Sequence, residues 1–351
     1  MATLYLIEQN TILRKTSDRV RLCRRPSRTK HSKHLTQDQI LLELPCADID
    51  HVMLFGNIQV TTQALQELLQ HGIELAIFTF SGRLIGQLTP PKTKNIYLRI
   101  DQFKRMLDNQ FCLTMSRRVV HSKIKCMLTL LKKYQYNHPD SFSIEELNSF
   151  ETIDIKVNQA SSIDSLRGFE GSASAAYFKL FGRMFTAPWK FTGRNRRPPK
   201  DPINAVLSFG YVVVGAEIQA LLDGIGFDPY LGFYHVADYG RPSLALDLLE
   251  EFRHSLVDQL ALNLFNLGKL NKKDFYDLPE GGVYLSSSGK KKFFLQYEKM
   301  QGEFISDTDT ADKKTGFRAL CQQRIRELAN TIKISSSHKI LEITAEEDFD
   351  I

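Results

Sequence analysis

Residues 1–90 contain short runs of β-branched and aromatic residues separated by turn-forming residues, a pattern typical of strands in a small sheet. Thr62–Gln70 differs, because its leucines recur at helical spacing and Thr61 or Thr62 can cap its first turn. We therefore expect a small β-sheet domain with one helix over residues 1–90. The predicted strands are Thr3–Glu8, Thr11–Lys15, Val20–Cys23, Leu41–Leu44, Val52–Phe55, Glu74–Phe80 and Leu84–Leu88.

Residues 98–340 carry apolar positions at helical spacing instead, which predicts a mainly α-helical domain and, with the first domain, an α+β fold. Residues 91–97 are the predicted linker, because the pair Pro90-Pro91 is incompatible with a helix or a central strand. Asp201 and Pro202 suit the start of a helix that runs to about Leu222. Other predicted helical segments are Leu98–Met115, Val119–Leu131, Ile144–Asn158, Ser162–Phe185, Leu244–Leu267 and Arg318–Ile334.

Charge is unevenly distributed along the 351 residues. The formal net charge is +6, and residues 1–40 alone hold nine Lys and Arg against three acidic residues. A second basic run covers Lys190–Lys200, whereas residues 341–351 form an acidic tail. Basic clusters suit contacts with phosphates, and the alternative is an ordinary solvated surface.

The cysteines and the apolar segments restrict the class of protein. The five cysteines form no C-x-x-C pair and are odd in number, which argues against a disulfide framework and a structural zinc site. The longest apolar stretch, Ala205–Ile218, is interrupted and is shorter than the roughly 20 residues of a membrane helix. We expect a soluble cytoplasmic protein with no membrane partner.

Two segments present a single candidate residue each. Glu170 lies in a predicted helix between Gly168 and Gly171, where small neighbours leave room for a large ligand. His235 ends an aromatic, glycine-rich loop that begins at Gly226. Taken alone, each is better explained as structural, Glu170 as a surface residue of a helix and His235 as a satisfied buried histidine.

A third segment carries several candidates on one helix. Asp247, Glu250, Glu251 and His254 follow the spacing i, i+3, i+4 and i+7, which would place them on one face. Carboxylates beside an apolar seam are costly unless a cation or hydrogen bonds compensate them. The alternative is a solvated acidic face with Arg253 as its internal counter-ion.

The three segments together favour metal chemistry. Two carboxylates and one imidazole, with no thiolate, suit Mg²⁺ or Mn²⁺ better than structural zinc. The basic run Lys190–Lys200 would hold a polyanion nearby. A hard cation neutralises charge that develops on phosphoryl oxygens and lowers the pKa of an attacking hydroxyl. These residues predict a metal-dependent enzyme that acts on DNA phosphodiesters.

Four ordered segments carry a family resemblance: Arg167–Gly171, Arg197–Ala205, Gly232–His235 and Ser243–Arg253. In them the chain resembles the CRISPR-associated integrase–endonuclease, the universal integrase subunit of spacer acquisition, over nearly its whole length. The resemblance implies that Glu170, His235 and Glu250 are metal ligands and that Asp247 supports them. His254 departs from the family, many of whose members carry proline there.

The resemblance also implies a reaction and an assembly. The 3′-hydroxyl of a captured DNA fragment would attack a phosphodiester at the edge of a CRISPR repeat, with no covalent enzyme intermediate. The β domain would form a homodimer, and two dimers would flank a small dimeric ferredoxin-like adaptation subunit in a heterohexamer. A reverse transcriptase is a further candidate partner. Our candidates for DNA contact are Arg194, Arg196, Arg197 and Lys200, with Asn204 and Tyr211 lining the same cleft.

Two other functions remain open at this point. One is a catalytically silent DNA-binding scaffold of the adaptation complex, which the intact set of candidate ligands argues against. The other is a structure-selective repair nuclease for branched DNA, which would use the same residues. The basic stretch at residues 24–33 has no assigned role in any of these hypotheses.

Overall fold

The computed structural model describes residues 2–24, 38–90, 95–195, 198–236, 238–279, 281–302 and 316–333. It divides into two compact units, Met1–Pro91 with Leu270–Leu295, and Lys92–Lys269 with Gln296–Ile351. Strands come first and helices follow, so the predicted α+β fold is confirmed. The acidic tail, most of the linker and nearly all of the basic stretch at residues 24–33 lie outside the described residues.

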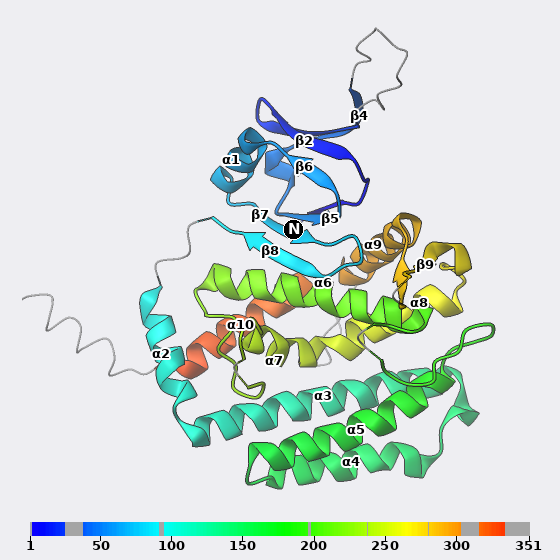
Figure 1. Ribbon diagram of the computed structural model, residues 1–351. Helices are drawn as coiled ribbons and strands as arrows, with labels where there is room; N and C mark the ends of the chain where they lie inside the picture. The colour runs from blue at the N-terminus through cyan, green and yellow to red at the C-terminus, as the bar shows by residue number, and fades with distance from the viewer. Residues whose placement is uncertain are drawn as a thin grey trace, which may run out of the picture. The chain divides into compact units, whose positions relative to one another are not determined.

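The first unit contains two four-stranded sheets, seen in blue and cyan in Figure 1. In the first sheet, three parallel strands are followed by an antiparallel edge strand; in the second, one parallel pair joins two antiparallel pairs. The first sheet has the order β1 (Thr3–Leu6), β5 (His51–Phe55), β7 (Glu74–Phe78) and β8 (Leu84–Leu88). The second has the order β4 (Gln39–Pro45), β3 (Arg19–Arg24), β2 (Thr11–Thr16) and β6 (Ile58–Val60).

Helix α1 (Thr62–Gln70) begins where the sequence predicts it. The side chain of Thr61 accepts a hydrogen bond from the Ala64 backbone nitrogen at 3.3 Å and so caps the first turn. Leu68 is fully buried in the same apolar cluster as residues from both sheets. Sequence reasoning missed β6, because a three-residue strand is too short to show alternation.

A hairpin from much later in the chain completes the first unit. Strand β9 (Phe275–Asp277) pairs with β10 (Val283–Leu285), and helix α9 (Ser287–Gly302) follows. The ring of Phe294 stacks on Tyr5 with centroids 3.9 Å apart. The sequence placed residues 270–295 within the helical region 98–340, whereas these long-range contacts group them with the first unit.

The second unit is helical, and Figure 1 shows α3, α4 and α5 lying side by side. The helices of the second unit are α2 (Ile96–Met106), α3 (Asn109–Asn137), α4 (Ile144–Gln159), α5 (Ile163–Arg183), α6 (Pro202–Ile225), α7 (Ser243–Phe252), α8 (Gln259–Asn266) and α10 (Phe317–Ile332), with the end of α9. A six-residue π-helical segment, η3 (Arg253–Asp258), separates α7 from α8. Short 3₁₀ turns are η1 (Cys46–Asp48), η2 (Pro139–Ser141) and η4 (Lys272–Asp274).

Helix α6 is the central helix of this unit. Asp201 accepts a hydrogen bond from the Asn204 backbone nitrogen at 2.8 Å, and Pro202 occupies the first turn, as predicted. Gly226, with φ of 111°, ends the helix one turn beyond the expected Leu222. By length and composition α6 could cross a membrane, but 78% of its apolar window is buried within the protein, as expected of a core helix.

Candidate metal centre

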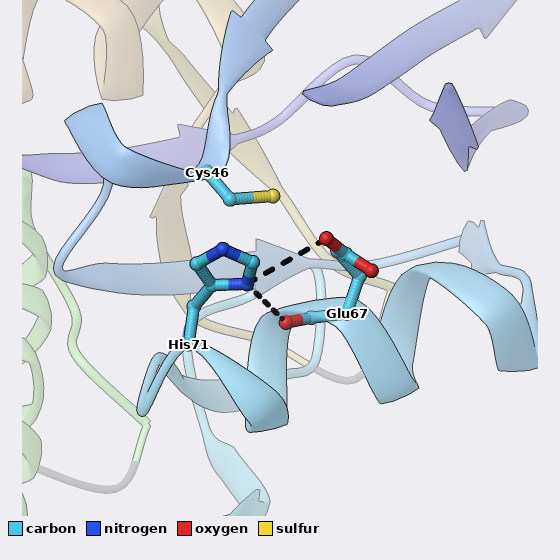
Figure 2. A group of neighbouring side chains, drawn as sticks. All are labelled: Cys46, Glu67 and His71. Carbon is cyan, nitrogen blue, oxygen red and sulfur yellow. Dashed lines mark hydrogen bonds and ion pairs between the residues drawn. The ribbon is translucent and has the colours of Figure 1, made fainter. Parts of the chain in front are cut away.

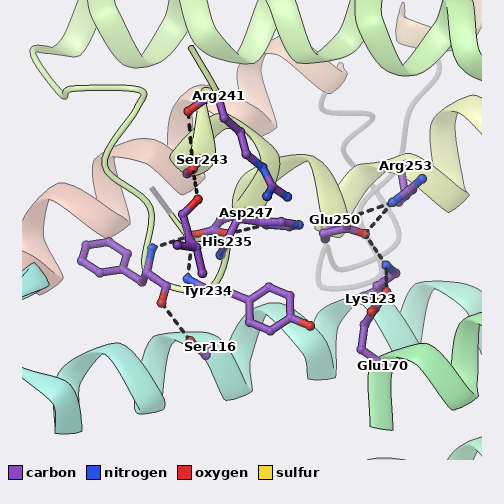
Figure 3. A network of polar contacts seen from close by, with 12 residues as sticks. Ser116, Lys123, Glu170, Tyr234, His235, Arg241, Ser243, Asp247, Glu250 and Arg253 are labelled. Atoms are coloured by element: carbon purple, nitrogen blue, oxygen red, sulfur yellow. Dashed lines mark hydrogen bonds and ion pairs between the residues drawn. The ribbon is translucent and has the colours of Figure 1, made fainter. Parts of the chain in front are cut away.

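Three elements of the second unit bring the predicted metal ligands into one region, which Figure 3 shows from close by. Glu170 comes from the middle of α5 and Glu250 from the last turn of α7. His235 comes from the loop between α6 and α7. Helix α3 runs past all three, because it packs against both α5 and α7.

The carboxylates of Glu170 and Glu250 share one cation, the ammonium of Lys123 on α3. Its Nζ lies 2.8 Å from Oε2 of Glu250 and donates a hydrogen bond to Oε1 of Glu170. The side chains of Lys123 and Glu250 are buried, whereas the Glu170 side chain is 23% exposed, so water reaches the contact only from the side of Glu170. No pattern in the sequence singled out Lys123, because a lysine on a helix is ordinarily solvated.

Arg253 adds a second positive charge on Glu250. Its Nη1 lies 2.8 Å from Oε1 and 3.0 Å from Oε2 of that carboxylate. Burial alone would raise the pKa of Glu250, but Arg253 and Lys123 outweigh burial and hold that pKa well below its usual range. Burial likewise opposes a lowered pKa of Glu170, and Lys123 overcomes it. Both carboxylates are therefore ionised and able to bind a cation.

Asp247 holds the loop that carries His235. Its Oδ1 lies 2.7 Å from Nδ1 of His235 and accepts the His235 backbone N–H at 2.9 Å. Its Oδ2 accepts the backbone N–H groups of Phe233 and Tyr234 at 2.7 and 3.0 Å. Because an ionised carboxylate only accepts hydrogen bonds, Nδ1 of His235 carries the proton and Nε2 keeps its lone pair for a metal.

Gly232 explains why this loop needs glycine. A Cβ atom there would lie 2.7 Å from the Ser243 carbonyl carbon and 2.8 Å from Oδ2 of Asp247. Any larger residue would therefore push the loop away from α7. The glycine-rich spacing noted in the sequence thus has a steric reason at this one position.

The stripe predicted on α7 separates into different contacts. Glu250 faces Lys123, whereas Oε1 of its neighbour Glu251 lies 2.7 Å from Arg324 of α10. His254 lies in η3, fully buried, with Nδ1 2.7 Å from Asp258. The alternative of a solvated acidic face is therefore wrong, because Asp247, Glu250 and His254 are buried. The proposed counter-ion role of Arg253 is seen in its contacts with Glu250.

A pocket of about 540 Å³ opens beside the carboxylates. Lys123 and Glu170 line it, together with Lys179 and Arg194, so its wall is mainly basic apart from Glu170. Phe178 adds an aromatic surface. A basic pocket of this kind suits a phosphate-bearing ligand.

The structure revises the predicted DNA contacts. Asn204 is fully buried and Tyr211 nearly so, and the Tyr211 hydroxyl donates to Asp258, so neither lines a cleft and we assign both a structural role. Arg194 reaches the pocket but also donates to Asn204 Oδ1 at 2.8 Å. Lys200 is exposed. Arg196 and Arg197 lie outside the described residues.

A second group of metal-binding residue types lies in the first unit (Figure 2). Among the described residues, Cys46, Glu67 and His71 are the group of three whose ligand atoms all lie within 4.8 Å of one another, so the ligand atoms of Glu170, His235 and Glu250 do not all meet this distance. Lys15 already neutralises Glu67. Burial raises the pKa of the Cys46 thiol, which therefore stays protonated. Glu170, His235 and Glu250 fit a hard divalent ion better, because their two ionised carboxylates already gather around a positive charge.

Comparison with known proteins identifies the family. Residues 4–299 match the family described as CRISPR associated protein Cas1. The chain is 36% identical over 261 residues to CRISPR-associated endonuclease Cas1 1 of Thermodesulfovibrio yellowstonii, covering 73% of this chain and 81% of the relative.

Solved structures share the fold. A casposase bound to integration product has a TM-score of 0.82 at 22% identity, covering 95% of this chain and 90% of that chain. A Cas6-RT-Cas1--Cas2 complex has a TM-score of 0.76 at 25% identity, covering 94% of this chain and 35% of the longer chain. The family resemblance inferred from the four motifs is confirmed, and the chain belongs to the Cas1 family of CRISPR associated proteins.

Proposed function

We propose that this Cas1 family protein is a metal-dependent DNA integrase whose catalytic centre is built from Glu170, His235, Glu250 and Asp247. The observation that carries the proposal is the pair of ionised carboxylates, the half-buried Glu170 and the buried Glu250, that share the ammonium of Lys123. The family supports it, since the curated relative is named an endonuclease and a neighbour in fold is a casposase bound to integration product.

In this proposal Glu170, Glu250 and Nε2 of His235 hold one divalent ion, Mg²⁺ or Mn²⁺, because the donors are oxygen and nitrogen. The ion would supply Lewis acidity that stabilises charge on the phosphoryl oxygens. Asp247 fixes the ring of His235 and the loop that carries it. Lys179, Arg194 and Lys200, and the undescribed Arg196 and Arg197, would attract the DNA backbone.

The proposed reaction is a transesterification. The oxygen of the 3′-hydroxyl on the captured fragment forms a bond to phosphorus at the repeat edge, and the bond from that phosphorus to the 3′-oxygen of the adjoining nucleotide outside the repeat breaks. The attacking hydroxyl gives up one proton and the leaving oxygen takes one up. The number of phosphodiester bonds is unchanged, so the reaction needs no nucleotide cofactor.

The assembly in this proposal follows the family. Residues 1–90 would form the homodimer, with DNA and the small ferredoxin-like subunit completing the heterohexamer in the cytoplasm. The fold similarity to a Cas6-RT-Cas1--Cas2 complex supports partner proteins of this kind, including a reverse transcriptase.

Strand transfer into a supercoiled plasmid with a leader and a repeat tests the proposal. Glu170→Ala and His235→Ala should lose at least about a hundredfold of activity, since each removes a ligand of the ion. Glu151→Ala is a matched control, because Glu151 is an exposed carboxylate of α4 paired only with Lys132 among the described residues. Folded Glu170→Ala protein that integrates as well as wild type would exclude this mechanism.

The name endonuclease also favours a second function, cleavage of branched DNA. The same residues would carry it, because reversal of integration is cleavage at a branch. Activity on branched DNA without any repeat, together with no strand transfer into the plasmid, would support a repair nuclease instead. A silent scaffold would bind DNA but show no metal-dependent rise in melting temperature.

A further inference from the structure

The Lys123 ammonium lies between two of the predicted metal ligands. It reaches from α3 into the space between Glu170 and Glu250, as Figure 3 shows, and contacts both carboxylates at once. An ammonium has three donor hydrogens and no acceptor, so two ionised carboxylates are suitable partners for it. Lys123 therefore offsets the repulsion between the negative charges of the half-buried Glu170 and the buried Glu250.

A divalent ion would need the same oxygens. Like charges a few ångströms apart in a site that is largely shielded from water repel strongly, so the ammonium and the ion compete for the same place. Arg253 also contacts both oxygens of Glu250, but among the described contacts it does not reach Glu170, so it does not bridge the two carboxylates as Lys123 does. The pocket that Lys123 lines gives its flexible side chain room to withdraw.

We propose that Lys123 is a positioning residue that acts as a built-in counter-ion: it holds Glu170 and Glu250 in place without metal and must withdraw when a divalent ion binds. The inference rests on the proposed metal site. It makes metal loading an exchange of cations, so Lys123 weakens the affinity of the site for the ion.

Titration of the full-length protein with Mn²⁺ alone, followed by electron paramagnetic resonance of free Mn²⁺, tests this. Lys123→Met keeps a long side chain without charge and should bind Mn²⁺ at least about tenfold more tightly than wild type, a change that corresponds to ~1.4 kcal/mol. Its melting temperature without metal should fall, because the buried Glu250 and the half-buried Glu170 lose their shared cation. Unchanged or weaker Mn²⁺ binding by Lys123→Met would overturn the proposal.

Two further variants sharpen the comparison. Lys132→Met is the matched control, because Lys132 lies on the same helix but pairs at the surface with Glu151. It should bind Mn²⁺ as wild type does. Lys123→Arg keeps the charge and should keep both the weak affinity and the metal-free stability.

The outcomes separate the two proposals. If wild type and Glu170→Gln bind Mn²⁺ equally, or neither binds it, the metal site itself is wrong. If wild type binds through Glu170 but Lys123→Met binds no more tightly, only the role of Lys123 fails. Should Lys123→Met not fold without metal, low Mn²⁺ concentrations should restore its fold, and failure to do so while wild type binds Mn²⁺ would count against the proposal.

Discussion

Oδ1 of Asp247 lies 2.7 Å from Nδ1 of His235, and the same carboxylate accepts three backbone N–H groups of the loop that carries this histidine. One side chain of α7 thus sets both the proton position on the ring and the path of the backbone. Hydrogen-bond partners of this kind fix the direction in which a histidine presents its free nitrogen. Several predictions for the metal centre depend on this contact.

Asp247→Asn should weaken metal binding and strand transfer by about 10–100-fold, because an amide replaces the charge that orients His235. Mn²⁺ titration and plasmid integration measure the two effects. Asp238→Asn, an exposed residue of the same loop, is the control. Equal behaviour of the two variants would show that Asp247 has no positioning role.

Glu250→Gln should abolish strand transfer, whereas Glu251→Gln should largely retain it. Glu250 faces Lys123 and Glu170, while Glu251 faces Arg324 of α10. Loss of the half-buried contact with Arg324 should lower the melting temperature of Glu251→Gln without changing its affinity for Mn²⁺. The same assays measure both variants, and a catalytic defect in folded Glu251→Gln would contradict the assignment of Glu250.

Gly232→Ala should destabilise the protein by about 1–3 kcal/mol and reduce strand transfer, since its methyl group would overlap Ser243 and Asp247. Chemical denaturation measures the first effect and plasmid integration the second. Gly215→Ala on α6, whose added Cβ would meet no atom within 4 Å, should be neutral or slightly stabilising. Wild-type activity of Gly232→Ala would show that the loop can shift to accept the methyl group without displacing His235.

Lys290 offers a pH-dependent prediction in the first unit. The Lys290 side chain is fully buried, and its Nζ lies 3.5 Å from the centroid of the Phe80 ring. Burial lowers the pKa of Lys290 from 10.5 to about 7. Between these two pKa values the Lys290 side chain is protonated in the unfolded chain and neutral in the folded protein. The free energy of unfolding of the wild type should therefore rise with pH across this interval. Below about pH 7 the folded protein carries the buried charge, and the destabilisation is complete.

Lys290→Met should therefore be more stable than wild type at about pH 6, with a gain that shrinks toward about pH 10. Chemical denaturation at several pH values measures this difference. Lys273→Met, an exposed lysine of the same unit, should show no such trend. A less stable Lys290→Met at low pH would mean that the contact with Phe80 outweighs burial of the charge.

Most of the fold could be predicted where a pattern had room to repeat. Helices α1 and α6 begin at Thr62 and Pro202, where the capping residues indicate. The missed elements lack such a signal. Strands β6, β9 and β10 have three residues each. Helix α9 opens with two serines and a glycine followed by three lysines, of which Lys290 is buried, and these residues hide its apolar face.

The candidate site was only partly accessible from the sequence. Motif resemblance pointed to Glu170, His235 and Glu250, whose roles as ligands stay predictions. We also expected Asn204 and Tyr211 to line a cleft, but the structure buries both, because residue type along a chain does not reveal which side of a helix faces the core.

The sequence by itself determined the α+β order of the elements, the helix boundaries marked by caps, and the family to which the chain belongs, because each depends on neighbours or motifs along the chain. Only the tertiary structure decided that Lys123 joins two carboxylates, that Asp247 holds His235, and that Glu250 and Glu251 face different partners. These contacts depend on how α3, α5, α7 and α10 pack, and packing unites residues whose separation in sequence carries no local signal.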